Sequence, residues 1–121
     1  MIRILLALSS LILVAGGIIH AAAFRRFDAA VAGTSLSPFY GNTARALWLI
    51  DSATQLILAL TFAWIAIRPG AASPVLIALI GLIPAATAVL IYVFVGNFAA
   101  GHLLMAAAVP ALIAAALSSF R

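Results

Sequence analysis

The sequence predicts an all-α integral membrane protein, an up-down bundle of four membrane-spanning helices that forms a single domain over residues 1–121. The composition is 68% hydrophobic and 7% charged, whereas a soluble domain averages about half apolar and about a quarter charged. Four apolar segments each approach the roughly 20 residues that a bilayer-spanning helix needs. The six cationic side chains are all arginines near the ends of these segments. That placement is typical of a membrane interface and argues against nucleic-acid binding.

The first predicted helix covers about residues 4–24 and lies between Arg3 and the Arg25–Arg26 pair. An arginine, an apolar run and three alanines would also fit a signal peptide. Because three more apolar segments follow, we interpret this one as a retained helix. The second predicted helix covers about residues 46–67, between Arg45 and Arg68.

The 20-residue first loop between these two helices is too long for a minimal turn. Its FRRFDAAVAG part predicts a short amphipathic helix in the membrane interface, with Phe24, Phe27 and Val31 on one face. The SLSPFYGN part, with its proline, glycine and serines, predicts a turn. We expect the two parts together to form a lid over one end of the bundle.

The third and fourth helices are predicted at about residues 74–95 and 98–117, the last ending near Arg121. RPGAASP, residues 68–74, predicts a turn, and Pro74 suits the first turn of a helix. Gly-Asn at 96–97 predicts a tight connection, so these two helices should form an antiparallel hairpin.

Prolines and small residues should shape how the last two helices pack. Pro84 and Pro110 lie inside the predicted helices, where each should produce a kink and free a backbone carbonyl. Small residues recur at four-residue spacing in Gly81 and Ala85, and in the series Ala107, Ala111, Ala115. Such faces let helices approach closely, either within one bundle or across a homodimer interface.

Three ionisable side chains are predicted at one depth in one leaflet. His20 and His102 each lie five residues inside the end of a predicted span and Asp51 lies six, which is roughly 7–9 Å at 1.5 Å per residue. Because the chain reverses direction at each span, all three fall in the same leaflet. Ionisable residues are costly within a membrane and mark functional sites. We therefore predict a ligand-binding site built on these three residues.

Three further residues are candidates for the same site. Tyr92 is predicted at that level near the end of the third helix, and Gln55 lies one helical turn from Asp51 on the same face. Arg45 is the third candidate, because Asp51 could form an ion pair with Arg45 or with Arg25. A purely structural interpretation stays open, since a carboxylate near a helix start favours the helix dipole and each histidine could donate to a backbone carbonyl.

Several functions fit such a site. The first is binding of an amphipathic small molecule, such as a quinone or a membrane lipid, through His20, Asp51, His102 and Tyr92. The second is a b-type haem with His20 and His102 as axial ligands. The third is a transition metal, iron or zinc, held by the two histidines and Asp51.

Two other interpretations need no bound cofactor. One is a proton-coupled homodimeric transporter in which Asp51 and His20 carry protons. The other is an accessory subunit of a larger membrane complex. Hydrolase or transferase chemistry finds little support, because no Ser–His pair stands in a recognisable motif. The chain also has no cysteine for thiolate chemistry or metal ligation.

The stretch RILLALSSLILVAGGIIHAAAF, residues 3–24, resembles the first helix of DoxX-like small bacterial membrane proteins. Those proteins have four spans in about this length, so the resemblance implies a bacterial inner-membrane location. Some members are linked to quinone-dependent oxidation as subunits, which implies a quinone ligand or a role as a subunit of a redox complex. The first loop and the stretch LWLIDSATQ do not match the family pattern, and the resemblance assigns no functional residue.

Overall fold

The computed structural model describes residues 1–68 and 70–120, so Pro69 of the predicted turn and the terminal Arg121 lie outside the described residues. The described chain is helical, without strands, in the order α1 (Ile2–Ala22), α2 (Phe24–Ala32), α3 (Pro38–Ile67), α4 (Pro74–Phe94) and α5 (Ala99–Ser118). Four helical stretches, of which α1 and α2 together make one, are long and apolar enough to cross a membrane. These features confirm the predicted all-α four-helix fold and indicate an integral membrane protein.

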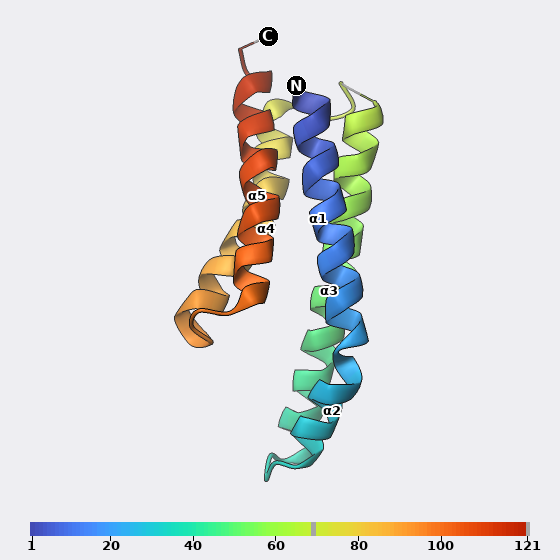
Figure 1. Cartoon of the computed structure of the whole chain (residues 1–121), viewed down its shortest axis with the longest axis vertical. Helices are drawn as coiled ribbons and strands as arrows, with labels where there is room; N and C mark the ends of the chain where they lie inside the picture. The colour runs from blue at the N-terminus through green and yellow to red at the C-terminus, as the bar shows by residue number, and fades with distance from the viewer. Residues whose placement is uncertain (69, 121) are drawn as a thin grey trace.

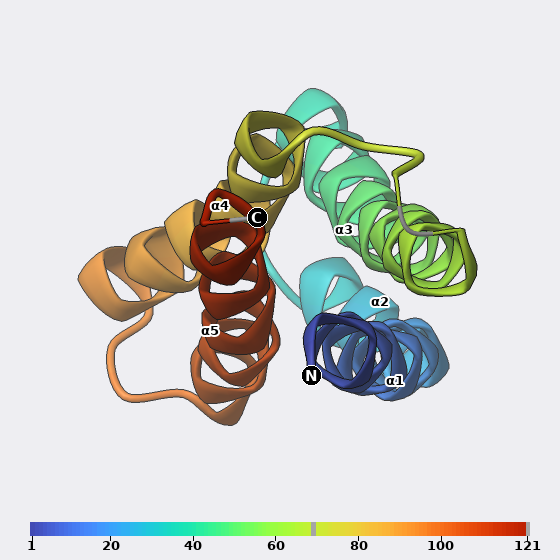
Figure 2. The same ribbon diagram turned by 90° about the horizontal axis from the view of Figure 1, so that it is seen from above.

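The helices form two antiparallel hairpins that meet along one face (Figures 1 and 2). One hairpin pairs α1 with α3, and the other pairs α4 with α5. The two hairpins are joined by the packing of α1 against α5. Although α3 and α4 follow each other in the sequence, they make little direct contact within the described residues. The two chain ends lie at the same end of the molecule (Figure 1).

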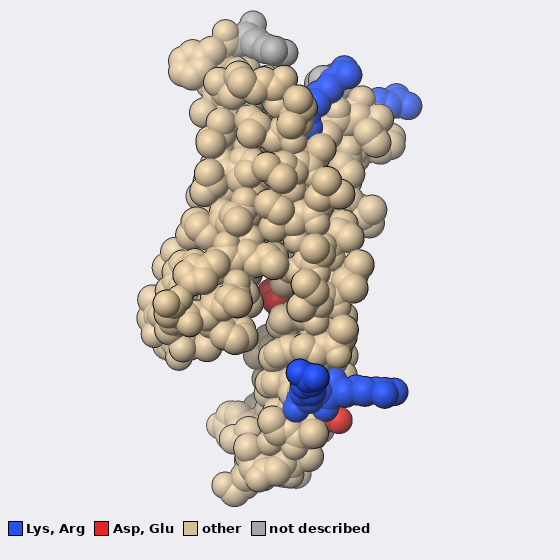
Figure 3. All heavy atoms as spheres, viewed as in Figure 1, with Lys and Arg blue, Asp and Glu red and all other residues tan. Residues whose placement is uncertain are grey.

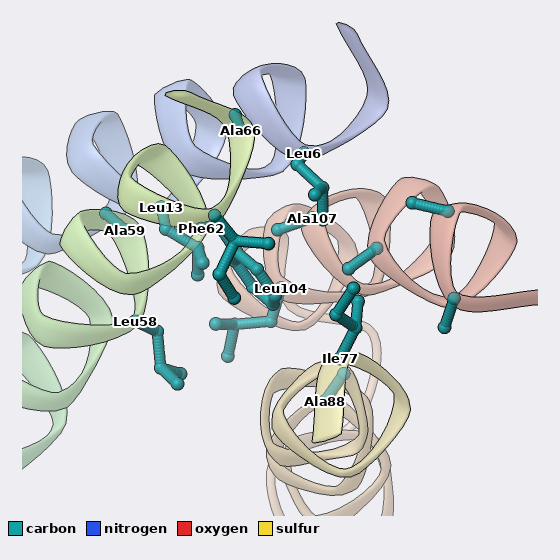
Figure 4. Packing of buried hydrophobic residues seen from close by; sticks show 14 residues of the cluster. Leu6, Leu13, Leu58, Ala59, Phe62, Ala66, Ile77, Ala88, Leu104 and Ala107 are labelled. Carbon is teal, nitrogen blue, oxygen red and sulfur yellow. The ribbon is translucent and has the colours of Figure 1, made fainter. Parts of the chain in front are cut away.

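The core lies where the hairpins meet, and Figure 4 shows side chains from α1, α3, α4 and α5 converging there. Phe62 of α3 is fully buried in this cluster, with Leu13 of α1 and Leu104 of α5. Small residues bring α4 close to α5, since a methyl group built on Gly81 would lie 3.3 Å from the Cβ of Ala111. The predicted small-residue faces are therefore used at least partly for packing within the chain.

Helix α3 begins at Pro38, eight residues before the predicted start, so the prediction of a turn at 35–42 was wrong. Ser37 has an extended backbone and Pro38 occupies the first helical position, where its missing N–H costs nothing. Gly41 lies within the helix and is buried. A methyl group there would lie 3.5 Å from Cγ1 of Val31, an ordinary contact distance, so this glycine lies at the junction of α2 and α3 and does not end the helix.

The predicted short helix in the first loop is present as α2, but its predicted orientation was wrong. Both views show α2 continuing the direction of α1 and lying beside the first turns of α3 (Figures 1 and 2). The α2–α3 elbow, residues 24–44, therefore projects past the α4–α5 loop and does not cover the end of the bundle. An ion pair between Asp28 and Arg45 joins α2 to α3.

Helix α4 bends partway along, and the α4–α5 hairpin diverges from α1 and α3 toward its loop (Figures 1 and 2). Pro84 lies buried inside α4, as the predicted kink requires. Gly96 follows the helix with a φ of 90° and donates its N–H to the carbonyl of Ile91, a left-handed conformation that favours glycine. The divergence places the start of α5 opposite the end of α1 with space between them.

The arginine side chains of the described residues lie at two levels, near the two ends of the molecule (Figure 3). Arg3 and Arg68 lie at the end that carries the start of α1, whereas Arg25 and Arg26 belong to the α2–α3 elbow and Arg45 directly follows it. The 22 residues from Arg3 to Arg25 span about 33 Å at 1.5 Å per residue. That length matches the roughly 30 Å hydrocarbon thickness of a bilayer.

Candidate ligand-binding site

His20 lies near the end of α1 and is held by α3 through both ring nitrogens. Its Nδ1 lies 2.8 Å from Oγ of Ser52, and its Nε2 lies 3.6 Å from Oδ2 of Asp51. The indole N–H of Trp48 donates to the backbone carbonyl of His20 over 2.9 Å. Because α1 ends two residues later, its last carbonyls lack helical hydrogen-bond donors. The Trp48 indole supplies a donor for one of these carbonyls, that of His20.

Trp48 is packed between two aromatic rings. The His20 ring stacks on it with a centroid distance of 4.0 Å, and the Phe27 ring of α2 stacks on it at 4.1 Å. Stacked pairs of this kind add to the hydrophobic gain from burial. The α2 helix thereby fixes the tryptophan that in turn contacts the histidine.

Asp51 and Gln55 form the second half of the site. The Nε2 of Gln55 donates to Oδ2 of Asp51 over 2.7 Å, across the single helical turn that their spacing predicts. The Gln55 residue is 4% exposed, and its Oε1 is buried without a hydrogen-bond partner within the described part of the chain. Leaving a buried acceptor unpaired costs about 1–3 kcal/mol, so this oxygen calls for an explanation.

His102 belongs to a different group on the α4–α5 hairpin. Its Nδ1 lies 3.0 Å from the Tyr92 hydroxyl, and its Nε2 lies beside Oδ1 of Asn97. The His102 side chain is exposed, whereas His20 is half-buried. We therefore correct the predicted single site to two groups, one around His20, Asp51 and Gln55 and one around His102 and Tyr92.

Arg45 pairs with Asp28, although the sequence analysis expected it to pair with Asp51. Its guanidinium bonds the carboxylate of Asp28 and the side chain of Asn42, so it fastens α2 to α3 and does not pair with Asp51. Depth along a helix was predicted, but the direction in which each side chain points around the helix was not.

The histidines and Asp51 do not form the predicted three-ligand metal centre within the described residues. Within residues 1–68 and 70–120, no group of three or more His, Asp or other ligating side chains could hold a metal ion. Each histidine already has a protein neighbour at both ring nitrogens. His20 and His102 lie in separate groups, so the predicted metal centre of two histidines and one aspartate is corrected here, and the bis-histidine haem stays a prediction.

A cavity of about 300 Å³ lies beside His20, between α1, α3 and the start of α5. Its lining is mainly apolar and includes Gly16, His20, Trp48, Gln55, Ala100 and Leu103. The volume lies at the lower end of the range for small-molecule sites, and a few polar groups in an apolar wall are typical of them. In Figure 3 a hollow separates the two hairpins, and one of the two acidic side chains of the protein is visible inside it.

Gly16 makes the close approach at this cavity possible. A methyl group built on Gly16 would lie 2.5 Å from Oε1 of Gln55 and 2.6 Å from Cδ2 of Leu103. The amide oxygen of Gln55 therefore points at the backbone of α1, at a wall of the cavity that all three residues line.

Two other hollows in the described structure have less support as binding sites. One of about 600 Å³ lies at the end that carries the termini, beside Arg3 and Ser118. The other, of about 350 Å³, is a shallow groove beside Tyr92 and His102. Neither is lined by a buried polar atom that lacks a partner among the described residues, so the cavity beside His20 is the candidate site.

Trp48 and Ser52 were missed as members of the site by the sequence analysis. A signal was present, because Trp48, Asp51, Ser52 and Gln55 recur at intervals of three and four residues and so share one face of α3. In an apolar helix, such a stripe of polar and amphipathic residues indicates the face that meets the site.

Comparison of the chain with family models, with curated proteins and with solved structures finds no match. The functional argument therefore rests on the geometry of the site and on the physical chemistry of its groups.

Proposed function

We propose that this protein binds an amphipathic small molecule, such as a quinone-type compound or a lipid, in the cavity beside His20. The polar head lies against Gln55 and its neighbours, and the tail lies along the apolar walls and the surrounding lipid. The buried, unpaired Oε1 of Gln55 at the wall of an apolar cavity carries the proposal. We place the protein in the bacterial inner membrane, the location that the DoxX-like resemblance implies.

The distribution of polar atoms supports a ligand with two chemically different ends. His20 and Gln55 supply polar groups on one side of the cavity, whereas Ile19, Phe98 and Leu103 supply apolar surface. Burying the tail gains about 25 cal/mol for each Å² of apolar surface removed from water. The head adds orientation by pairing with the buried oxygen.

The arrangement of the helices supports access from the membrane. The α4–α5 hairpin diverges from α1 and α3 toward its loop, and α3 makes little direct contact with α4. A membrane-dissolved molecule can therefore enter between the hairpins without crossing the packed core around Phe62.

Tryptophan fluorescence tests the proposal, because the chain has two tryptophans and one of them, Trp48, lines the cavity. A Trp64→Phe variant leaves Trp48 as the only reporter. We would titrate this protein in lipid nanodiscs with a decyl-bromophenol that carries its bromine meta to the hydroxyl, since bromine quenches tryptophan on contact. We expect saturable quenching of Trp48.

Two substitutions on α5 control for unspecific partitioning of the probe. Ala100→Phe fills the cavity and should weaken binding about tenfold or more, the equivalent of about 1.4 kcal/mol. Ala116→Phe places the same side chain at an exposed position of the same helix and should leave binding unchanged. Quenching that never saturates and is equal in both variants would show that the cavity does not bind the probe.

A further inference from the structure

We infer that the cavity selects a head group that donates a hydrogen bond, an alcohol or phenol hydroxyl, over one that only accepts. This inference rests on the proposed function and specifies the chemical class of its ligand. It follows from the hydrogen-bond partners of the side-chain polar atoms at the cavity, because one buried side-chain oxygen has none within the described residues.

The side-chain nitrogens that line the cavity each lie beside a polar group of the protein. The Nε1 of Trp48 donates to the carbonyl of His20, and the Nε2 of Gln55 donates to Asp51. The ring nitrogens of His20 face Ser52 and Asp51. Among the buried side-chain atoms of the described residues, the amide oxygen of Gln55 is the one without a hydrogen-bond partner, and an amide oxygen can only accept.

The orientation of the Gln55 amide is fixed by its neighbour. A flipped amide would place Oε1 against Oδ2 of Asp51, where two acceptors would face each other without a proton between them. The observed orientation gives the carboxylate its donor and leaves the amide oxygen pointing at Gly16.

The oxygen is buried, so the inference includes a movement of the Leu103 side chain that uncovers it toward the cavity. Gln55 and Leu103 line the same wall, and the Leu103 side chain packs beside the position where a Gly16 side chain would stand. A rotation of that flexible side chain opens the approach. A hydroxyl then gives Oε1 its missing proton, whereas an ether or a quinone carbonyl would leave the oxygen unpaired.

A matched pair of probes tests the selection on the Trp64→Phe protein. Decyl-bromophenol and its methyl ether have the same ring, tail and bromine, and differ only in that a methyl group replaces the proton of the hydroxyl. We expect the ether to bind about tenfold more weakly, because it leaves a buried acceptor unpaired. Equal, saturable binding of both probes would overturn the inference and leave the proposed function standing, whereas no saturation by either probe would overturn the proposed function itself.

Substitution of Gln55 tests whether its amide oxygen causes the preference for the phenol over the ether. Gln55→Met keeps the length of the side chain but removes the acceptor, so the phenol and its ether should then bind within about twofold of each other. Thr61→Val removes a hydroxyl that bonds only within α3 and should keep the full preference. A preference that survives in Gln55→Met would contradict the inference. The comparison of the two probes on unsubstituted Gln55 decides the matter even if that variant does not fold.

Displacement experiments distinguish the two sources of such a hydroxyl. Decyl-hydroquinone carries it on an aromatic ring, and monodecanoylglycerol carries it on a lipid backbone. Displacement of the bromophenol by either compound supports selection of a donor and shows which head the cavity holds. Decyl-benzoquinone is the oxidised form of the hydroquinone and has no hydrogen-bond donor. If it displaces the bromophenol as well as decyl-hydroquinone does, the inference of donor selection is overturned.

Discussion

At the scale of single residues, the contact between Gly16 and Gln55 brings together the tightest packing and the unpaired oxygen of the site. A glycine in the middle of a helix normally lowers its stability relative to alanine. Here an added side chain must displace the ends of Gln55 and Leu103, and moving the Gln55 amide disturbs its hydrogen bond to Asp51.

Gly16→Ala should therefore destabilise the protein, although alanine is the better helix former. The methyl group would lie 2.5 Å from Oε1 of Gln55, and overpacking of this kind costs about 1–3 kcal/mol. Thermal unfolding in detergent should show a lower midpoint. Gly33→Ala is the control, since a methyl group there meets nothing closer than 3.5 Å and should change the midpoint little. A higher midpoint for Gly16→Ala would contradict the described packing.

Trp48→Phe should lose a hydrogen bond while keeping a ring between His20 and Phe27. The carbonyl of His20 would lose its indole donor at the end of α1, which costs about 0.5–1.5 kcal/mol. A lower melting midpoint measures this loss. Trp64→Phe removes an indole that is 57% exposed and should have a smaller effect. Equal effects of the two substitutions would show that the bond contributes nothing.

At the scale of elements, the α2 helix packs against Trp48 on the side opposite His20 and so helps to fix the position of the Trp48 ring. The Phe27 ring stacks on Trp48, and the pair of Asp28 with Arg45 lies at the same junction. The ion pair is partly exposed, so it contributes roughly 0–1 kcal/mol, and the aromatic contact carries more of the attachment.

Phe27→Ala should loosen α2 from α3 and expose Trp48. In the Trp64→Phe background the emission of Trp48 should shift to longer wavelength, and protease cleavage at residues 33–37 should become faster. Arg25→Ala changes an exposed residue of the same helix and should do neither. An unchanged emission maximum in Phe27→Ala would mean that α2 does not protect the tryptophan.

The start of α3 shows where prediction of elements failed and why. The proline, glycine and asparagine of SLSPFYGN are typical turn residues, and they led the analysis to place the helix start eight residues too late. Proline is equally suited to the first turn of a helix, and Gly41 lies buried within the helix near Val31 of α2. Local preference allowed both outcomes, and the contact with α2 decided between them.

At the scale of the whole molecule, the fold is two hairpins held together along α1 and α5. The α5 side of this core is built largely from alanines, among them Ala107, Ala111 and Ala114, each with no exposed surface. Close packing of small residues replaces the large hydrophobic side chains of a soluble core, because lipid offers no hydrophobic gain for bringing helices together.

Ala107→Leu should therefore push the hairpins apart. The position has no exposed surface, so the added carbons must displace neighbours at a cost of about 1–3 kcal/mol. Ala106→Leu, at the exposed neighbouring position of α5, should leave stability nearly unchanged. Thermal unfolding in the same detergent compares the two, and equal midpoints would show that the α1–α5 face is not tightly packed.

The sequence by itself determined the class of fold and the depth of each polar residue. The thickness of a bilayer sets the length of an apolar run, so all four spans could be located and counted. Helical rise then gave the level of His20, Asp51 and His102, and helical spacing gave the pairing of Asp51 with Gln55.

Only the tertiary structure decided which of these residues meet. A membrane helix is apolar on all sides, so its sequence carries little indication of which face meets lipid and which meets another helix. Residues at equal depth were therefore expected together, yet His102 pairs with Tyr92 and Arg45 pairs with Asp28. The bend of α4 and the packing of α1 on α5 set these directions, and both depend on contacts between segments far apart in the sequence.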